Sequence, residues 1–161
     1  MQEIQNKPAI KTFAALSFDV NSFAVTKATC KPGTRNIWTI VDEVYNNNLE
    51  AENKFFSYGL VVEALQKLAI PKHSEILTVT PNLDKKIGDY KTKQIVLDVN
   101  TAIADVLSLI CTKELIFSPG LESLQQELEE FSADDEKHSH RVISLFLAIS
   151  QPVKVNYLLY S

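Results

Sequence analysis

The sequence predicts an α/β fold in which helices flank a mixed five-stranded sheet, and three observations indicate it. Short apolar or alternating runs fill residues 12–45 and are separated only by brief turn signals, which is typical of an antiparallel meander. Apolar residues recur at helical spacing only later, at residues 55–68 and 95–111. Two more short apolar runs alternate with these helices, so helical crossovers are expected to join parallel strands in the later part of the sheet.

The first three strands are expected within the first 45 residues. Residues 12–18, TFAALSF, form a nearly continuous apolar run that is typical of a buried strand, and Asp19 ends it. Residues 22–30 alternate moderately between apolar and polar side chains. A Lys-Pro-Gly-Thr turn at residues 31–34 then leads to residues 36–45, which are rich in β-branched and aromatic residues.

The first helix is expected to begin at the three asparagines 46–48. An asparagine side chain can accept a hydrogen bond from the free amides of a first helical turn. Glu50 and Glu52 then fall in that turn, where carboxylates stabilise the positive end of the helix dipole. Pro71 is expected to close the helix.

The remaining elements alternate strands and helices. Residues 74–80 are predicted to form a fourth strand that ends at Pro81, and a short helix is expected at residues 84–88. An amphipathic helix is predicted at residues 95–111, and residues 114–120, ELIFSPG, are predicted to form the fifth strand. The pattern beyond them is helical and acidic, and then helical and more apolar.

Length and composition indicate one soluble globular domain. The chain has 161 residues, of which 45% are hydrophobic and 22% charged, so residues 1–161 are expected to form a single domain with its core at about 11–149. No apolar run is long enough to cross a membrane, and the N-terminus lacks the layout of a signal peptide. Cys30 and Cys111 make no disulfide framework, so a cytoplasmic protein is expected, with both thiols packed as small apolar groups.

The charge of the chain favours a protein partner over bare nucleic acid. Sixteen basic and twenty acidic residues give a net charge of −4. Nonspecific nucleic-acid binders carry a basic stripe, whereas the basic residues here are scattered, and seven acids with no base lie between Leu121 and Glu136. Any nucleic-acid role is therefore expected to be local, metal-mediated or supplied by a partner.

The aromatic side chains are expected in the core. Phe13, Phe18, Trp38, Phe55 and Phe56 lie in the apolar runs of predicted strands and the first helix. A platform for stacking bases would need exposed aromatic side chains among positive charge. The sequence offers the aromatic residues without that surrounding charge.

The order of elements resembles the ribonuclease H fold, and the resemblance spans roughly residues 11–149. The segment LSFDVNS looks like the first strand and catalytic aspartate of that family, and NNNLEAE is similar to its opening of the first helix. SEILTVTPNLDKKI resembles the fourth strand, ELIFSPG looks like the fifth, and the acidic helix lies where the family places its last carboxylate.

The resemblance implies a site for divalent cations. In that family carboxylates on adjacent strand ends and a helix hold two cations about 4 Å apart, one activating water and the other stabilising the leaving oxygen of a phosphodiester. Magnesium suits such hard oxygen ligands. The catalytic residues implied are Asp19, Glu52, Asp84 and Glu127, with Asp19 and Glu52 as metal ligands. Alternatives remain open, and these are Glu50 for the helix acid and Glu129 or Glu130 for the last one.

The sequence departs from the family pattern at the fourth strand. The position of the expected aspartate holds Pro81, flanked by Asn82, and proline offers no metal-binding side chain. Asp19 also fits a turn former at a strand end, and Glu50 and Glu52 fit the first turn of a helix. His138 and His140 would point about 200° apart on a helix, so a shared zinc site is not expected there.

Three functions are compatible with these patterns. The first is a catalytically degenerate ribonuclease H-like domain, a pseudo-nuclease that serves as an interaction or scaffolding module in a nucleic-acid-handling assembly. The second is a metal-dependent nuclease that hydrolyses RNA or RNA–DNA hybrids with Mg²⁺. The third is a small acidic inhibitor or immunity-type protein that binds a basic partner. A concentrated acidic patch away from the carboxylates would favour the third.

Overall fold

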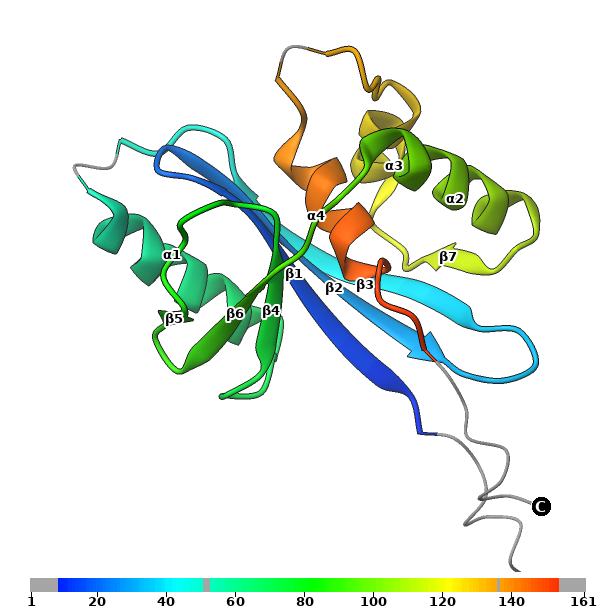
Figure 1. The fold of residues 1–161 in the computed structure, drawn as a ribbon, viewed down its shortest axis with the longest axis horizontal. Helices are drawn as coiled ribbons and strands as arrows, with labels where there is room; N and C mark the ends of the chain where they lie inside the picture. The colour runs from blue at the N-terminus through cyan, green and yellow to red at the C-terminus, as the bar shows by residue number, and fades with distance from the viewer. Residues whose placement is uncertain (1–8, 51–52, 136, 154–161) are drawn as a thin grey trace, which may run out of the picture.

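The computed structural model describes residues 9–50, 53–135 and 137–153. Its centre is a seven-stranded mixed sheet with the strand order β5-β6-β4-β1-β2-β3-β7. Figure 1 shows α1 beside β4, β5 and β6, and it shows α2 and α3 gathered with β7 on the opposite side. Two hydrophobic clusters fill the two faces of the sheet, one beneath α1 and the other beneath α2, α3 and α4.

The predicted antiparallel meander is confirmed. β1 (Lys11–Asp19), β2 (Ser22–Lys31) and β3 (Ile37–Asn46) pair in order, with a register shift at Lys27/Ala28. Successive side chains of a strand point to opposite faces. Ala14 and Leu16 of β1 therefore enter the cluster beneath α1, while the side chain of Ala15 enters the cluster beneath α4.

The segment after the fourth strand differs from the expectation. β4 (Glu75–Thr78) pairs in parallel with β1, as predicted for the later strands. The helix predicted at residues 84–88 is wrong, because a hairpin of β5 (Lys86–Ile87) and β6 (Tyr90–Gln94) forms there. Gly88 turns this hairpin with φ +59, and a Cβ at that position would lie 2.9 Å from a methyl group of Val62.

The predicted fifth strand forms, but it lies at the far edge of the sheet. β7 (Leu115–Phe117) pairs in parallel with β3, and the place next to β4 is taken by β6. The sheet therefore has seven strands in place of five. Pairing partners depend on contacts between distant segments, which the periodicity of a single segment does not encode.

The first helix begins later than predicted. α1 (Lys54–Lys67) has Asn53 as its N-cap, and the Asn53 side chain accepts hydrogen bonds from the amides of Phe55 and Phe56. No acid lies in its first turn, so the proposed dipole role of Glu50 is wrong. Glu52 lies outside the described residues.

The other helices are α2 (Val99–Cys111), α3 (Glu122–Glu129) and α4 (His140–Ala148). The prediction of a helix at residues 95–111 is confirmed from Val99 onward. α4 packs on β1 and β2, and every residue from Arg141 to Ala148 is buried. Among the described residues, no helix combines the length and the apolar character that a membrane span requires.

Part of the predicted core is exposed. Trp38 and Cys30 are buried as expected, and Phe13 and Phe18 are partly buried. By contrast, the side chains of Phe55 and Phe56 are 67% and 55% exposed. The physical reason is the position of Ser57, the next residue. Its hydroxyl donates to the carbonyl of Val20 at the tip of the β1–β2 hairpin, 2.5 Å away. Because this contact lies at the end of the sheet, the start of α1 that precedes it projects beyond the sheet.

Cys111 also differs from the prediction. It ends α2 and is exposed, whereas packing in the core was expected. The apolar pattern of residues 95–111 predicted the helix correctly, but a pattern reports which side chains are apolar and not whether a second layer covers them.

Candidate functional site at the carboxyl ends of β1 and β4

The candidate site is a cleft where β1 and β4 end beside the start of α4. β1 and β4 are parallel neighbours, so their carboxyl ends meet at one edge, which is where open α/β sheets bind ligands. The hydroxyl of Ser17 lies 2.6 Å from Nδ1 of His140, joining β1 to the first residue of α4. The Thr80 hydroxyl donates to the carbonyl of Phe18 at 3.2 Å, which joins the end of β4 to β1.

The lining of this cleft is mostly apolar, with neutral hydroxyl, amide and imidazole groups among the apolar side chains. A cavity of about 610 Å³ lies between Ser17, Thr80 and His140, and Pro81, Ile95 and Ile143 are among its apolar neighbours. No acidic residue is among the described side chains that line it. Pro81 therefore stands in the cleft itself, at the end of the strand where the family pattern places an aspartate.

Asp19 is the last residue of β1 and its side chain is exposed. Its Oδ1 accepts a hydrogen bond from the amide of Asn21 at 3.1 Å, in the turn that leads into β2. This contact is the one expected of a turn former. The role of Asp19 as a metal ligand stays a prediction.

His140 lines the cleft, and its surroundings in the folded protein shift its pKa. Burial lowers the pKa of His140 below its ordinary value, the nearby Asp19 carboxylate raises it, and Lys137 lowers it further. The neutral imidazole is therefore favoured in the folded protein. Its Nδ1 contacts Ser17, while Nε2 is buried without a hydrogen-bond partner among the described residues.

Asp84 lies on the other face of the sheet, in the connection between β4 and β5. Its Oδ1 is 2.9 Å from Nζ of Lys54, the first residue of α1. The backbone amide of Asp84 donates to the hydroxyl of Tyr58 at 3.4 Å. These contacts hold Asp84 against α1, so its carboxylate is engaged by a lysine ammonium.

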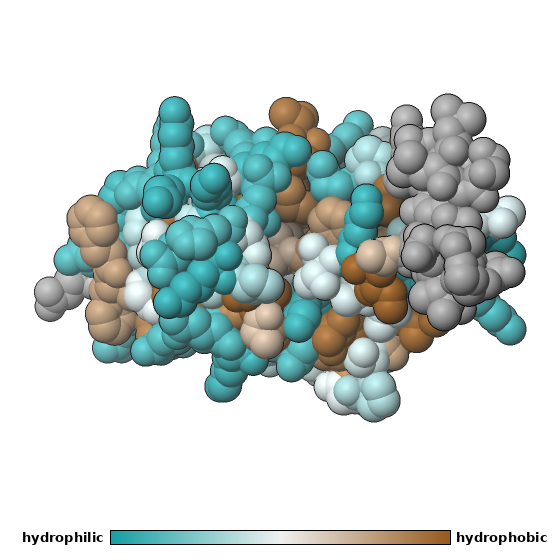
Figure 2. Space-filling view, turned by 90° about the horizontal axis from the view of Figure 1, so that it is seen from below, coloured by the Kyte–Doolittle hydropathy of each residue, from teal (hydrophilic) through white to brown (hydrophobic). Residues whose placement is uncertain are grey.

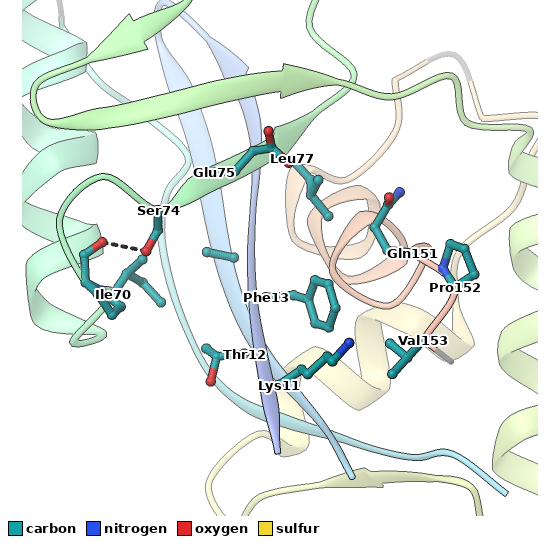
Figure 3. A pocket seen from close by; sticks show the side chains of 12 residues that line it. Lys11, Thr12, Phe13, Ile70, Ser74, Glu75, Leu77, Gln151, Pro152 and Val153 are labelled. Atoms are coloured by element: carbon teal, nitrogen blue, oxygen red, sulfur yellow. Dashed lines mark hydrogen bonds between the residues drawn. The ribbon is translucent and has the colours of Figure 1, made fainter. Parts of the chain in front are cut away.

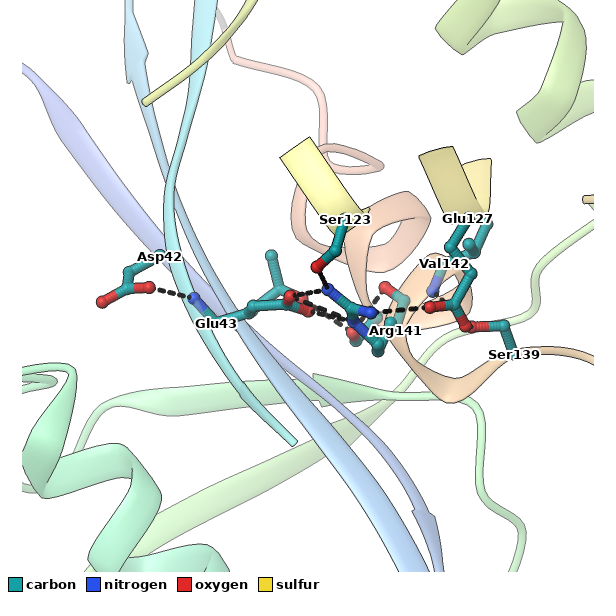
Figure 4. Close-up of polar contacts among 9 residues, drawn as sticks. Asp42, Glu43, Ser123, Glu127, Ser139, Arg141 and Val142 are labelled. Carbon is teal, nitrogen blue, oxygen red and sulfur yellow. Dashed lines mark hydrogen bonds and ion pairs between the residues drawn. The ribbon is translucent and has the colours of Figure 1, made fainter. Parts of the chain in front are cut away.

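Glu127 belongs to a buried ion cluster, which Figure 4 shows between α3, α4 and β3. Nη1 of Arg141 lies 2.7 Å from Oε2 of Glu127, and Nε of Arg141 lies 3.0 and 3.1 Å from the two carboxylate oxygens of Glu43. Nη2 of Arg141 also contacts Glu43 and lies 2.8 Å from the Ser123 hydroxyl. The Ser139 hydroxyl donates to Glu127 as well. The carboxylate of Glu127 is therefore engaged in the packing of three elements.

The guanidinium of Arg141 is well matched to this position. The side chains of Arg141 and Glu43 are only 7% and 6% exposed. Burial lowers the pKa of Arg141, but the hydrogen bond and charge of Glu43 and the charge of Glu127 together raise it above its ordinary value. The ring of Tyr45 lies 4.1 Å from the guanidinium carbon and adds a cation–π contact.

The three predicted carboxylates that the structure describes are therefore engaged separately. Asp19 lies at the β1–β2 turn, Asp84 is held by Lys54, and Glu127 is held by Arg141. The described part of the chain contains no group of three or more His, Cys, Asp or Glu side chains placed to hold a metal ion. Asp19, Asp84 and Glu127 do not by themselves form a two-cation centre, although Glu127, Glu130 and His140 line one cavity of about 410 Å³. Glu52 lies outside the described residues, and its assignment stays a prediction.

Sequence reasoning missed the roles of His140, Arg141 and Glu43. Arg141 carries a detectable signal, because a charge inside the apolar run RVISLFLA must be paired when that helix is buried. The signal does not name the partners, since Glu43 is 98 residues away in the chain. The contact between Ser17 and His140, separated by 123 residues, leaves no local signal at all.

A second cavity, of about 470 Å³, lies at the opposite end of β1 and β4 (Figure 3). Phe13 and Leu77 project into it from the two strands, and Pro152 and Val153 close it from the segment after α4. Its one described acid, Glu75, is 3.9 Å from Nζ of Lys93. The amino ends of parallel strands are not the usual position of a ligand site, so the cleft beside His140 remains the candidate.

Comparison with solved structures identifies the fold. The nuclease domain of the large terminase from the thermophilic phage G20c, solved with bound cobalt, superposes with a TM-score of 0.55 at 14% identity, covering 89% of this chain and 82% of that one. The terminase nuclease domain of human cytomegalovirus gives 0.50 at 8% identity, covering 86% and 82%. The chain therefore has a ribonuclease H-like fold, as its order of elements predicted. No protein-family model and no curated protein matches the sequence.

Proposed function

We propose that this chain is a catalytically degenerate ribonuclease H-like domain that serves as an interaction module in a nucleic-acid-handling assembly. The observation that carries the proposal is the separation of its carboxylates. Asp84 and Glu127 are each bound by a cationic side chain, and the cleft at the ends of β1 and β4 is lined by His140 and Pro81 in place of acids. A cation site needs several carboxylates at one place.

The nucleic-acid setting is supported by the fold and not by the charge. Two similar structures are nuclease domains of terminases, one from phage G20c and one from human cytomegalovirus. The net charge of −4 disfavours direct binding to a phosphate backbone, so a protein partner in the same assembly is the expected contact. In this proposal the chain keeps the ribonuclease H-like fold but has lost metal-dependent hydrolysis in the cleft.

A nuclease assay tests this proposal. Purified protein would be incubated with single-stranded DNA, duplex DNA, RNA and an RNA–DNA hybrid in Mg²⁺ or Mn²⁺, with a phage terminase nuclease domain as the active control. The expected result is no cleavage above that of the Asp19→Asn variant. Metal-dependent cleavage that Asp19→Asn abolishes would overturn the proposal.

A metal-dependent nuclease is the second candidate, because Asp19 is exposed at the carboxyl end of β1 and lies near His140. In that case Asp19 and Glu52 would hold Mg²⁺, which would activate water for hydrolysis of a phosphodiester. Glu52→Gln and Asp19→Asn should then lower activity to the same extent, while Glu50→Gln should leave it unchanged. Activity that survives Asp19→Asn would exclude this candidate.

A further inference from the structure

α2 leaves several of its apolar side chains exposed, although Val99, Ile103 and Leu109 pack against the core. Val106 is its one buried residue, whereas Leu107 is 56% exposed, Ile110 is 39% exposed, and Cys111 at its end is exposed. A helix of a soluble protein normally buries its apolar stripe against a second layer. Contiguous exposed apolar residues of this kind mark a surface that contacts another molecule.

The uncovered face of α2 continues into β7 and α3. Ile116 of β7 is 48% exposed, and with Ile110 and Leu128 it lines a groove of about 460 Å³ between the three elements. Leu115 and Phe117 line the same groove, and Glu129 of α3 stands at its side. We call this surface the α2–β7–α3 groove. It is a hollow with an apolar floor, unlike the scattered single apolar residues of an ordinary surface.

The groove also contains a free strand edge. Among the described strands, β7 pairs only with β3 and ends the sheet. The carbonyl of Glu114 and the amide of Ser118 bond to β3, and alternate residues of a strand bond to the same side. The backbone groups of Leu115 and Phe117 therefore face away from the sheet, where an added strand of another chain can bond to them.

The elements that form this groove carry more exposed acids than bases, because Asp105, Glu122 and Glu129 are exposed on α2 and α3 while Lys113 also lines the groove. From residue 98 to residue 135 the chain has one basic residue, Lys113, and nine acidic ones. These acids are Asp98, Asp105, Glu114, Glu122, Glu127, Glu129, Glu130, Asp134 and Asp135. Two of them are already paired, Glu127 with Arg141 and Glu114 with Arg35. Residues 54–94, which form α1 and β4 to β6, have seven lysines and four acids. Figure 2 shows the side of the molecule over β5 and β6 as largely hydrophilic, with hydrophobic side chains gathered in the middle and right.

The acidic charge of these elements favours one kind of binding partner for the groove. A second copy that docked by the same surface would bring two predominantly acidic surfaces together, which opposes association. A segment with lysine or arginine around apolar side chains would meet the acids with its charges and the groove with its apolar face. The surface is therefore complementary to a basic partner.

We propose that the α2–β7–α3 groove binds a basic amphipathic segment of a partner protein. The segment adds a strand to the free edge of β7 and places its apolar side chains between Ile110, Ile116 and Leu128. The inference rests on the proposed function, because it names the surface and the partner chemistry of the interaction module. It does not depend on the cleft beside His140, which lies elsewhere on the molecule.

A selection from a random peptide display library against the immobilised full chain tests the inference. We expect the enriched peptides to alternate apolar residues with lysine or arginine. Binding of a synthetic copy should weaken by about tenfold or more in Ile110→Lys and in Glu129→Lys, since both side chains line the groove and such residues dominate interfaces. Matched controls are Ile10→Lys, an exposed apolar residue elsewhere, and Glu63→Lys on α1, and both should bind within about twofold of the parent chain.

Modification of Cys111 provides a second readout that needs no variant. A bound peptide should slow the reaction of Cys111 with a thiol reagent, because Cys111 ends the uncovered face of α2. Two variants on different elements keep the test valid if one of them disturbs the fold, which circular dichroism would report.

Several outcomes would overturn the inference. These are enrichment of no peptide, enrichment of acidic or uncharged peptides, or binding that Ile110→Lys and Glu129→Lys leave intact. Self-association in sedimentation that Ile110→Lys abolishes would assign the groove to a second copy and would also overturn it. Nuclease activity in the cleft would refute the proposed function while leaving this binding unchanged, so the two failures are distinguishable.

Discussion

Arg141 shows how one side chain decides the role of others. Its guanidinium lies between Glu43 of β3 and Glu127 of α3, at the start of the buried helix α4. Glu127, a candidate ligand in the sequence, is here paired with a permanent cation of the same chain. That pair occupies one of its carboxylate oxygens.

Removing Arg141 should destabilise the fold strongly. Arg141→Ala leaves Glu43 buried without its partner, and loss of one member of a buried ion pair costs about 3–5 kcal/mol. Arg35→Ala is the control, because the Arg35–Glu114 pair is 3.0 Å long but Arg35 is 59% exposed, and exposed pairs contribute about 0–1 kcal/mol. Urea unfolding measures both. Equal losses in the two variants would contradict the role given to the buried cluster.

The double variant Arg141→Met/Glu43→Leu refines the measurement. It removes both charges and fills the space with apolar atoms, so it should be more stable than Arg141→Ala. A double variant that is as unstable as the single one would mean that packing and not charge explains the loss.

His140 should make stability depend on pH. Its folded pKa is lowered from 6.5, so the unfolded chain takes up the proton first as pH falls. The free energy of unfolding should therefore decrease as pH drops from about 6.5 through the lower folded pKa, and it should be fully present above 6.5. His140→Gln should remove this part of the slope in urea unfolding at several pH values. His73→Asn, at an exposed histidine, should keep it, and an unchanged slope in His140→Gln would contradict the prediction.

At the scale of elements, local patterns predicted that a helix or strand exists better than they predicted where it begins and ends. The alternation in β2 and β3 and the apolar spacing in α1 come from burial on one face, which a sequence displays directly. The β5–β6 hairpin was missed because KKIGDYKTK has no apolar period, and its pairing with β4 makes it a strand. The start of α1 was misplaced because asparagines at positions 46–48 and at 53 are equally good caps in isolation.

The cap of α1 can be tested by substitution. Asn53→Ala should lower the free energy of unfolding by about 1 kcal/mol, because its side chain accepts from the amides of Phe55 and Phe56 at 3.0 and 3.2 Å. Asn47→Ala lies in the run where the cap was predicted and should change stability by less than about 0.5 kcal/mol. Thermal or urea unfolding compares the two. A larger loss of stability in Asn47→Ala than in Asn53→Ala would contradict Asn53 as the cap and would favour a helix that begins near residues 46–48.

At the scale of the whole molecule, the sequence predicted the fold correctly, but it did not predict which side chains its acidic residues contact. The order of strands and helices was enough to indicate a ribonuclease H-like fold, which the terminase nuclease domains share. The position of β7 and the partners of Asp84 and Glu127 depend on contacts between segments far apart in the chain. Charge is also unevenly divided along the chain, with acids concentrated in the segment of α2 and α3 and lysines in the segment of α1 and β4 to β6.

A metal titration tests most directly whether the fold has been kept without its chemistry. Mn²⁺ would be added to the ¹⁵N-labelled protein and to Asp19→Asn, and amide line broadening would be followed along the chain, with calorimetry for Mg²⁺. The account predicts weak broadening that does not saturate and is the same in both proteins. Saturable broadening confined to residues 17–22 and 140, and absent from Asp19→Asn, would contradict it and would show that a working cation site survives in the cleft.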